Sequence, residues 1–254
     1  MSLKMKAKLK TQDMGLYKYK MAKTIKIANG QGFWGDSIDA PVKLIKNSSI
    51  DYLTLDYLAE VTMAIMQKQY NKDPNTGFAS DFIVFIKNNF IDMINNNIKV
   101  ITNAGGVNPH MCAKLIKDID SSIKVAVVDG DNILDKIHQY IDDGVAFNNL
   151  DTGESIESIE DSICSANIYV DSFIVSEALA SNPHIVLGGR ITDPGLVVGP
   201  CIYEFGWNRD DYDKIALSTV AGHIIECGAQ CTGGNHTRWW EVDNLADIGY
   251  PILE

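Results

Sequence analysis

A chain of 254 residues is long enough to bury a sizeable core, either as one large domain or as two small ones. Its hydrophobic fraction of 46% and charged fraction of 22% are those of an ordinary globular protein. The sequence has no apolar run near the roughly 20 residues that span a bilayer. Its net charge of −11 argues against a nucleic-acid surface. We therefore expect no membrane and no nucleic acid among its partners.

Positive charge is concentrated in residues 1–20, which carry six Lys and one Asp. Because the whole chain carries −11, the remaining residues carry −16. We interpret residues 1–20 as a basic N-terminal extension whose Met-Ser-Leu start derives from expression, with Met21 as the natural start. A transit peptide is the rival interpretation, but the segment has no Arg and little Ser. Five scattered cysteines and no visible secretory signal predict reduced thiols and a cytoplasmic protein.

Apolar, β-branched runs alternate with helix-like segments along the rest of the chain. Strands are predicted at residues 24–28, 52–55, 99–102, 123–128 and 184–187. Helices are predicted at residues 59–70, 81–93, 111–119, 133–141 and 211–230, and residues 149–160 read as a polar surface excursion. Strands separated by helices favour an α/β fold, namely a doubly wound, mostly parallel sheet with helices on both faces. An incomplete or irregular β/α barrel is the alternative.

Glycine-rich loops follow three of these strands. The first loop contains Asn103, Gly105, Gly106 and Asn108. The second contains Gly188, Gly189, Arg190, Thr192 and Asp193, and the third begins with Asp129. Paired glycines allow a close backbone approach, and the helix N-terminus after each loop would offer free N–H groups to an anion. Such residues are also what ordinary turns contain, so the case for a shared ligand crevice rests on the loops recurring.

Two of the loops also predict how the following helix begins. Asn108 and Asp193 are good N-cap residues, and each is followed by a Pro suited to the first helical position. Asp131 is expected to cap the helix after the third loop.

The segment at residues 30–35 has the form G-x-G-x-x-G and follows a predicted strand. Phe33 and Trp34 are bulky where a pyrophosphate needs to approach the backbone, and no acidic residue is suitably spaced at a strand end. A dinucleotide site is therefore only weakly indicated, and no motif specifies a cofactor.

A second group of reactive side chains lies near the end of the last predicted helix. His223 and Cys227 share a helical face, which Cys231 would join if the helix continued. Imidazole and thiolate are common zinc ligands, so this pattern suggests a zinc site. The glycines after Cys227 make that continuation doubtful, so no metal ligand is assigned. His223 with Glu226 is favoured as an acid/base pair, and a buried, hydrogen-bonded structural histidine remains the alternative.

Five motifs together resemble the acyclic terpene utilisation protein A (AtuA) family, in order and from about residue 24 to the end. They are Q31-GFWGDS, D51-YLTLDYLAEVTM, T102-NAGGVNP, G188-GRITD and A221-GHIIECGAQCTGG. Family members are typically longer, so residues 21–254 resemble an N-terminal portion, either truncated or from a short member. The family pattern often has a small residue where this chain has Cys231, which lowers the zinc interpretation further.

The resemblance implies catabolism of acyclic terpenes and related branched acids through CoA thioesters. With the loops, it suggests an enzyme of the lyase or hydrolase class that performs acid/base chemistry on a small carboxylate or acyl-CoA. Arg190 and the loop N–H groups would hold the anion, and the catalytic candidates are His223, Glu226, Asp36, Asp129 and Asp193. Asp56 and Glu60 are second-line candidates because an acidic residue after a strand can equally cap a helix.

Two alternatives remain open. The chain could be a non-catalytic ligand-binding subunit of an acyl-CoA carboxylase-type assembly, with a carboxylase-like partner. A nucleotide-dependent oxidoreductase is less favoured. A homo-oligomer fits any of these functions.

Overall fold

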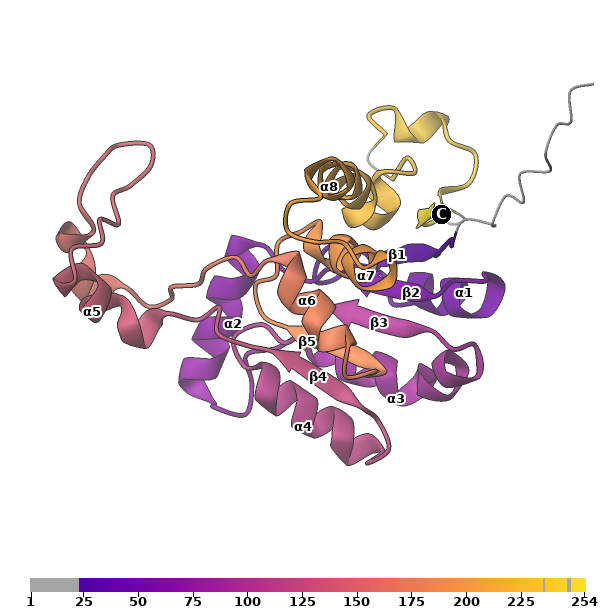
Figure 1. Cartoon of the computed structure of the whole chain (residues 1–254), viewed down its shortest axis with the longest axis horizontal. Coiled ribbons are helices and arrows are strands. Elements are labelled where there is room, and N and C mark those ends of the chain that lie inside the picture. Colours follow the sequence, from indigo (N-terminus) through magenta and orange to yellow (C-terminus); the bar gives the residue numbers. More distant parts are fainter. Residues whose placement is uncertain (1–22, 235, 246–247) are drawn as a thin grey trace, which may run out of the picture.

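The computed structural model describes residues 23–234, 236–245 and 248–254, so the predicted extension at residues 1–20 and Met21 lie outside it. Within the described residues, six strands form one open sheet in the order β4-β5-β3-β2-β1-β6 (Figure 1). The strands are β1 (Ile27–Gln31), β2 (Tyr52–Leu55), β3 (Lys99–Thr102), β4 (Val125–Val128), β5 (Ile185–Gly188) and β6 (Ile252–Leu253). All neighbours pair in parallel except β6, which is antiparallel to β1. The predicted mostly parallel α/β fold is confirmed, and the barrel alternative is wrong because the sheet does not close.

Helices cover both faces of the sheet. One face carries α1 (Asp39–Asn47), α2 (Glu60–Lys72), α3 (Ser80–Asn95) and α4 (Pro109–Ile119), whose buried side chains share one apolar cluster with the strands. A second cluster lies on the opposite face under α6 (Ser172–Leu179), α7 (Gly195–Phe205) and α8 (Tyr212–Glu226). The chain therefore has two cores, separated by the sheet.

Side-chain alternation along the central strands explains these two cores. In β5, Ile185 and Leu187 join the first cluster while Val186 joins the second. In β3, Val100 and Ile101 divide in the same way. Because successive side chains point to opposite faces, a strand that is apolar throughout must be covered on both sides.

The chain changes direction across the sheet after β4. Strands β1, β2, β3 and β4 advance towards one edge, and their connecting helices α1 to α4 lie on the first face. The chain then returns from β4 to β5, and α6 lies on the second face, as right-handed crossovers require. The segment after β3 thus leads to one face and the segment after the adjacent β5 leads to the other. This divergence marks the usual ligand crevice of an open α/β sheet.

Most predicted elements match the structure to within a few residues, and two end three or four residues from their predicted ends. The first strand was expected at residues 24–28, but β1 extends to Gln31 because its polar residues find buried partners: the Asn29 side chain accepts the N–H of Gln31 and donates to the carbonyl of Glu226. Gly30 is therefore inside the strand. The last helix ends at Glu226 rather than at residue 230, because Gly228 adopts the left-handed φ of +56° and a 3₁₀ turn, η4 (Gly228–Gln230), follows.

The excursion between β4 and α6 projects away from the sheet (Figure 1). The helix predicted at residues 133–141 is divided into η1 (Leu134–Lys136) and α5 (Ile137–Asp142). The polar stretch predicted as a surface excursion lies farther along and contains η2 (Ile156–Ser158), before η3 (Glu160–Ser162). A last 3₁₀ turn, η5 (Trp239–Glu241), precedes β6.

Candidate active site

The two glycine-rich loops after β3 and β5 touch each other at the divergence point. The backbone N–H of Gly105 donates to the carbonyl of Gly188 over 3.0 Å. The side chain of Asn103 connects this pair of loops to the end of β2, since its Oδ1 accepts the N–H of Tyr57 at 2.7 Å and its Nδ2 donates to Asp56 at 2.6 Å. Asn103 thus fixes the position of the Asp56 carboxyl group.

Three carboxyl groups meet at this edge of the sheet. They belong to Asp56 after β2, Asp193 before α7 and Glu226 at the end of α8, and one carboxylate oxygen from each lies within 4.8 Å of the others. The three residues are far apart in the sequence and lie at the end of one strand and at the ends of two helices. Their convergence is produced by the fold, not by any local motif.

Asp56 is the most buried of the three, with 2% of its surface exposed. Its Oδ1 accepts hydrogen bonds from Asn103 Nδ2 and from the N–H of Leu58, at 2.6 and 3.0 Å. Its Oδ2 is buried and has no hydrogen-bond partner among the described residues. Burial raises the pKa of Asp56 to about 7, and the negative charges of Asp193 and Glu226 add to the rise, against the hydrogen bonds that lower it.

Arg190 is buried and binds Asp193, another of the three carboxyl groups. Its guanidinium donates to Asp193 Oδ1 at 2.8 Å and to the carbonyl of Leu58 at 3.1 Å, and it reaches Glu60 Oε1 at 3.4 Å. It also lies over the ring of Tyr169, 4.5 Å from the ring centroid. With 5% of its surface exposed, Arg190 acts in this structure as a clamp between the ends of β2 and β5. Its predicted contact with an anionic ligand stays a prediction.

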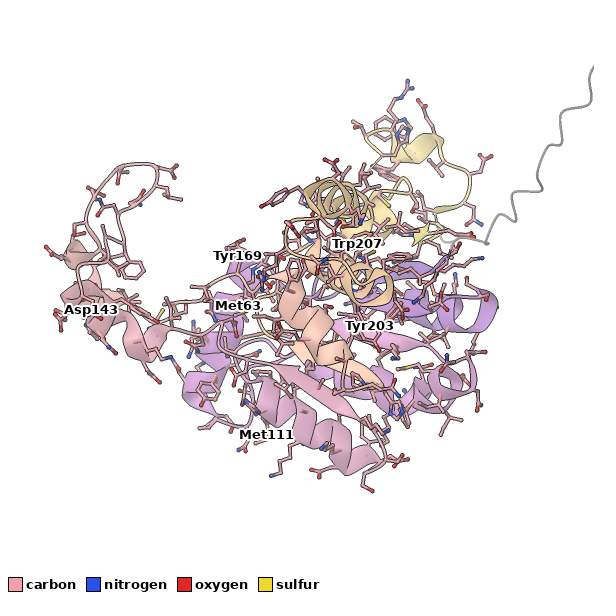
Figure 2. All side chains as sticks on the ribbon, viewed as in Figure 1. Met63, Met111, Asp143, Tyr169, Tyr203 and Trp207 are labelled. Carbon is pink, nitrogen blue, oxygen red and sulfur yellow. The ribbon has the colours of Figure 1, made fainter. Side chains whose placement is uncertain are left out.

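Tyr169 closes one side of Arg190 from the end of the projecting excursion. Its hydroxyl donates to Glu60, and this bond is the main reason why the pKa of Glu60 is lowered. Figure 2 shows Tyr169 beside the body of the molecule, whereas Asp143 lies out on the excursion. Sequence reasoning missed Tyr169, because nothing in its local sequence distinguishes it from the other exposed aromatic residues.

His223 and Glu226 lie close together at the end of α8, and their role as an acid/base pair stays a prediction. The two side chains are 3.6 Å apart, with His223 Nδ1 facing Glu226 Oε2, and the imidazole is mostly exposed while the carboxyl group is largely buried. Burial and the charge of Asp193 raise the pKa of Glu226. Cys227 lies next to them, with its Sγ 3.7 Å from Glu226 Oε1, whereas Cys231 is exposed beyond the end of the helix. The helical face that was considered for zinc does not continue.

The other two catalytic candidates lie away from the three carboxyl groups and have other partners. Asp36 accepts the N–H groups of Gly32 and Ser37 and the hydroxyl of Tyr250, so it holds the loop after β1. Asp129 lies at the end of β4 and pairs with His110 at 2.6 Å, where both side chains are exposed. Neither residue belongs to the group of three carboxyls.

The predicted ligand-binding glycines Gly105, Gly106, Gly188 and Gly189 are all buried. The N–H of Gly106 donates to the carbonyl of Asn103, as that of Gly105 does to Gly188. A Cβ on Gly189 would lie 2.5 and 2.6 Å from the carboxylate oxygens of Asp131. These glycines therefore allow segments of the chain to pack closely, and their contact with a ligand stays a prediction.

Of the three predicted helix caps, one forms and the other two do not. Asn108 caps α4 by accepting the N–H of Met111, with Pro109 in the first turn, and it also donates to two carbonyls of the loop before α3. Asp193 does not cap α7, because its carboxylate is bound to Arg190. Asp131 instead accepts the backbone N–H of Arg190, and the backbone N–H of Thr192 donates to Val170.

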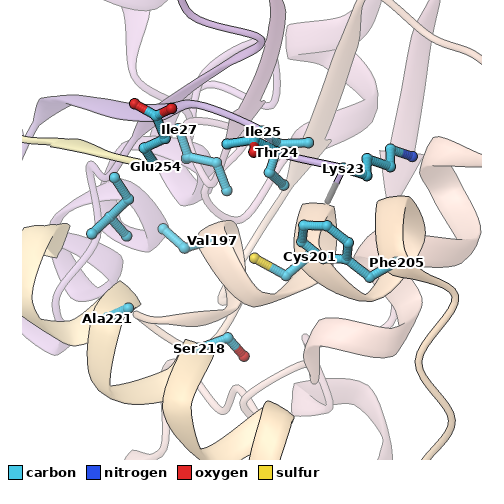
Figure 3. A pocket seen from close by; sticks show the side chains of 11 residues that line it. Lys23, Thr24, Ile25, Ile27, Val197, Cys201, Phe205, Ser218, Ala221 and Glu254 are labelled. Atoms are coloured by element: carbon cyan, nitrogen blue, oxygen red, sulfur yellow. The ribbon is translucent and has the colours of Figure 1, made fainter. Parts of the chain in front are cut away.

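An apolar cavity of about 340 Å³ lies away from the three carboxyls, between β1 and the helices α7 and α8. Figure 3 shows Val197 and Cys201 from α7 facing Ala221 and Ser218 from α8. Residues 23–25, which precede β1, and Ile27 at its start close the space. Its lining includes none of the three carboxyls or the residues of the two glycine-rich loops. The cavity and the three carboxyl groups therefore belong to separate parts of the structure.

The family model for the acyclic terpene utilisation family protein AtuA matches residues 25–254. The chain belongs to this family. No curated protein and no solved structure matches it. In the part of the chain that the structure describes, the helices are too short or too polar to cross a membrane. Membership of the AtuA family implies a part in acyclic terpene utilisation, and the predicted resemblance is confirmed.

Proposed function

We propose that this AtuA-family chain is a cytoplasmic enzyme that adds water to a small carboxylate or acyl-CoA, by hydration or hydrolysis. In hydration, water adds across a carbon–carbon double bond. In hydrolysis, water cleaves the thioester C–S bond and yields a carboxylic acid and the free thiol. Both reactions need a polar group that orients water and accepts its proton.

The convergence of Asp56, Asp193 and Glu226 at the divergence point of the sheet carries this proposal. Carboxyl groups are costly to bury together, and their grouping beside Arg190 is typical of a working site rather than of a structural core. The loops after β3 and β5 contact each other at this edge of the sheet, and the proposed substrate lies against them.

A panel of acyl-CoA thioesters and free carboxylates tests the proposal. Hydrolysis is followed by the release of free CoA thiol, and hydration by the loss of the enoyl chromophore. The wild-type chain is compared with Glu226→Gln, which keeps the shape of the side chain, and with Asp118→Asn as a matched control on the exposed surface of α4. We expect turnover in the wild type and in Asp118→Asn, and a loss of at least a hundredfold in Glu226→Gln.

Two results would contradict this proposal, the first its site and the second the enzyme itself. Equal turnover in Glu226→Gln would exclude the carboxyl cluster from the reaction. Binding of an acyl-CoA without turnover, together with recovery of a biotin-dependent carboxylase subunit in a pull-down, would favour the non-catalytic ligand-binding subunit.

A further inference from the structure

We propose that Asp56, Asp193 and Glu226 bind one divalent cation of the Mg²⁺ or Mn²⁺ type. This inference deepens the proposed function, on which it rests, because it supplies a cation to the same edge of the sheet. The cation would polarise a substrate oxygen or activate the attacking water there.

The spacing of the three oxygens suits a single ion. Ligand oxygens lie about 2.0–2.1 Å from Mg²⁺, so two of them on one octahedral ion are roughly 3–4 Å apart. One oxygen from each of the three carboxyls lies within 4.8 Å of the others, so small side-chain rotations bring them to that spacing. The remaining positions of the ion are left for water and substrate, which is the usual arrangement at Mg²⁺ sites.

Asp56 provides an independent reason to expect a ligand. Its Oδ1 is fully engaged by Asn103 and Leu58, but its Oδ2 is buried and unpartnered among the residues that the structure places. A buried polar atom normally has a partner, because leaving it without one destabilises the folded state. A cation between the three carboxyls would give Oδ2 that partner.

The local charge also favours a divalent ion. The ionised forms of Asp56, Asp193 and Glu226 carry three negative charges, and Arg190, which binds Asp193, supplies one positive charge. Two negative charges therefore remain, which one divalent cation neutralises. Glu60 is already paired with Arg190 and is mostly exposed, so water solvates its charge.

The donor set selects the type of cation. All three donors are carboxylate oxygens, which Mg²⁺, Mn²⁺ and Ca²⁺ prefer, whereas zinc and copper favour nitrogen and sulfur. The cation is thus expected at the sheet edge, and not on His223 and the two cysteines that follow α8.

Isothermal titration of the whole chain with MnCl₂, after treatment with a chelator, tests the site. We expect saturable binding of one Mn²⁺ per chain, displaced by Mg²⁺, with a matching loss of the free Mn²⁺ signal in electron paramagnetic resonance. Glu226→Gln and Asp193→Asn should weaken the affinity about tenfold or more, and Asp118→Asn should not change it. Circular dichroism confirms that each variant is folded. Asp56→Asn should weaken the affinity as well. If that variant does not fold, the Mn²⁺ affinity of Glu226→Gln still tests the site.

Three results would overturn the proposed cation site. They are no saturable Mn²⁺ or Mg²⁺ binding at millimolar concentrations, undiminished binding in folded Glu226→Gln, and tight binding of Zn²⁺ alone. The two proposals fail separately. Mn²⁺ binding without turnover of any acyl-CoA or carboxylate would contradict the enzyme and leave the cation site standing. Turnover that is unaffected by a chelator, together with no Mn²⁺ binding, would contradict the cation site and leave the proposed enzyme standing.

Discussion

Gly189 lies where the loop after β5 passes the Asp131 carboxylate, and replacing it by Ala tests this close approach. The added Cβ would lie 2.5 and 2.6 Å from the two Asp131 oxygens and 2.7 Å from the carbonyl oxygen of Gly106. Gly189 does not have a left-handed φ, so the backbone itself accepts Ala and the effect comes from packing. At least one of the neighbours must therefore move.

The expected cost follows from these contacts. Overpacking a buried site costs about 1–3 kcal/mol, and displacing Asp131 would also break the 2.9 Å bond that it accepts from the N–H of Arg190, for about 1–3 kcal/mol more. We expect Gly189→Ala to lower the free energy of unfolding by about 2–6 kcal/mol, and Tm by roughly 4–24 °C. Urea unfolding followed by tryptophan fluorescence measures the change.

Gly249→Ala is the matched control. Gly249 has an ordinary φ, and a Cβ built on it meets nothing within 4 Å, so this change should stay within about 0.5 kcal/mol of the wild type. If Gly189→Ala were as stable as Gly249→Ala, the close packing of the loop against Asp131 would be refuted.

Three further predictions concern buried polar and thiol groups. Asn103→Ala removes a donor from Asp56 and an acceptor from a buried N–H group, so it should lower the free energy of unfolding by about 2–5 kcal/mol in urea, and a neutral result would contradict the bridging role. Burial raises the pKa of Asp131, so its native form keeps a proton that the unfolded chain releases from about pH 4 upwards. This residue therefore makes stability fall as the pH rises from about 4 towards its native pKa. Asp131→Asn should show a smaller fall between pH 4 and 7 in thermal melts, and an identical slope would refute the shift. Burial also raises the pKa of Cys201 to about 11, so about one thiol in a thousand is ionised at pH 8, and iodoacetamide should modify exposed Cys164 far sooner, as mass spectrometry of timed samples would show or disprove.

Most of the fold could be predicted because the pattern of apolar residues depends on burial. The strand β2 (Tyr52–Leu55) and the strand β3 (Lys99–Thr102) have the limits that their apolar runs predict. The end of β1 could not be predicted, because Asn29 and Gln31 are buried through partners distant in the sequence. The short helix α1 (Asp39–Asn47) was not predicted, although Pro41 lies in its first turn and Ala40, Leu44 and Ile45 are buried.

The candidate site was predictable in place but not in composition. The loops with Asn103 and Gly188 do meet at one edge, since parallel strands end together. Asp56 was given second rank, because an acidic residue after a strand looks like a cap. Only the fold shows that its carboxyl group faces those of Asp193 and Glu226 across the sheet end.

The position of the ligand is the central claim, and hydrogen–deuterium exchange measures it directly. The chain is compared with and without saturating isovaleryl-CoA in the presence of Mn²⁺. We predict slower exchange in the loops at residues 103–109 and 188–194 and at the end of β2. Protection confined to residues 23–27 and 197–205, around the apolar cavity, or no protection at all, would contradict a ligand site at the carboxyl ends of the strands.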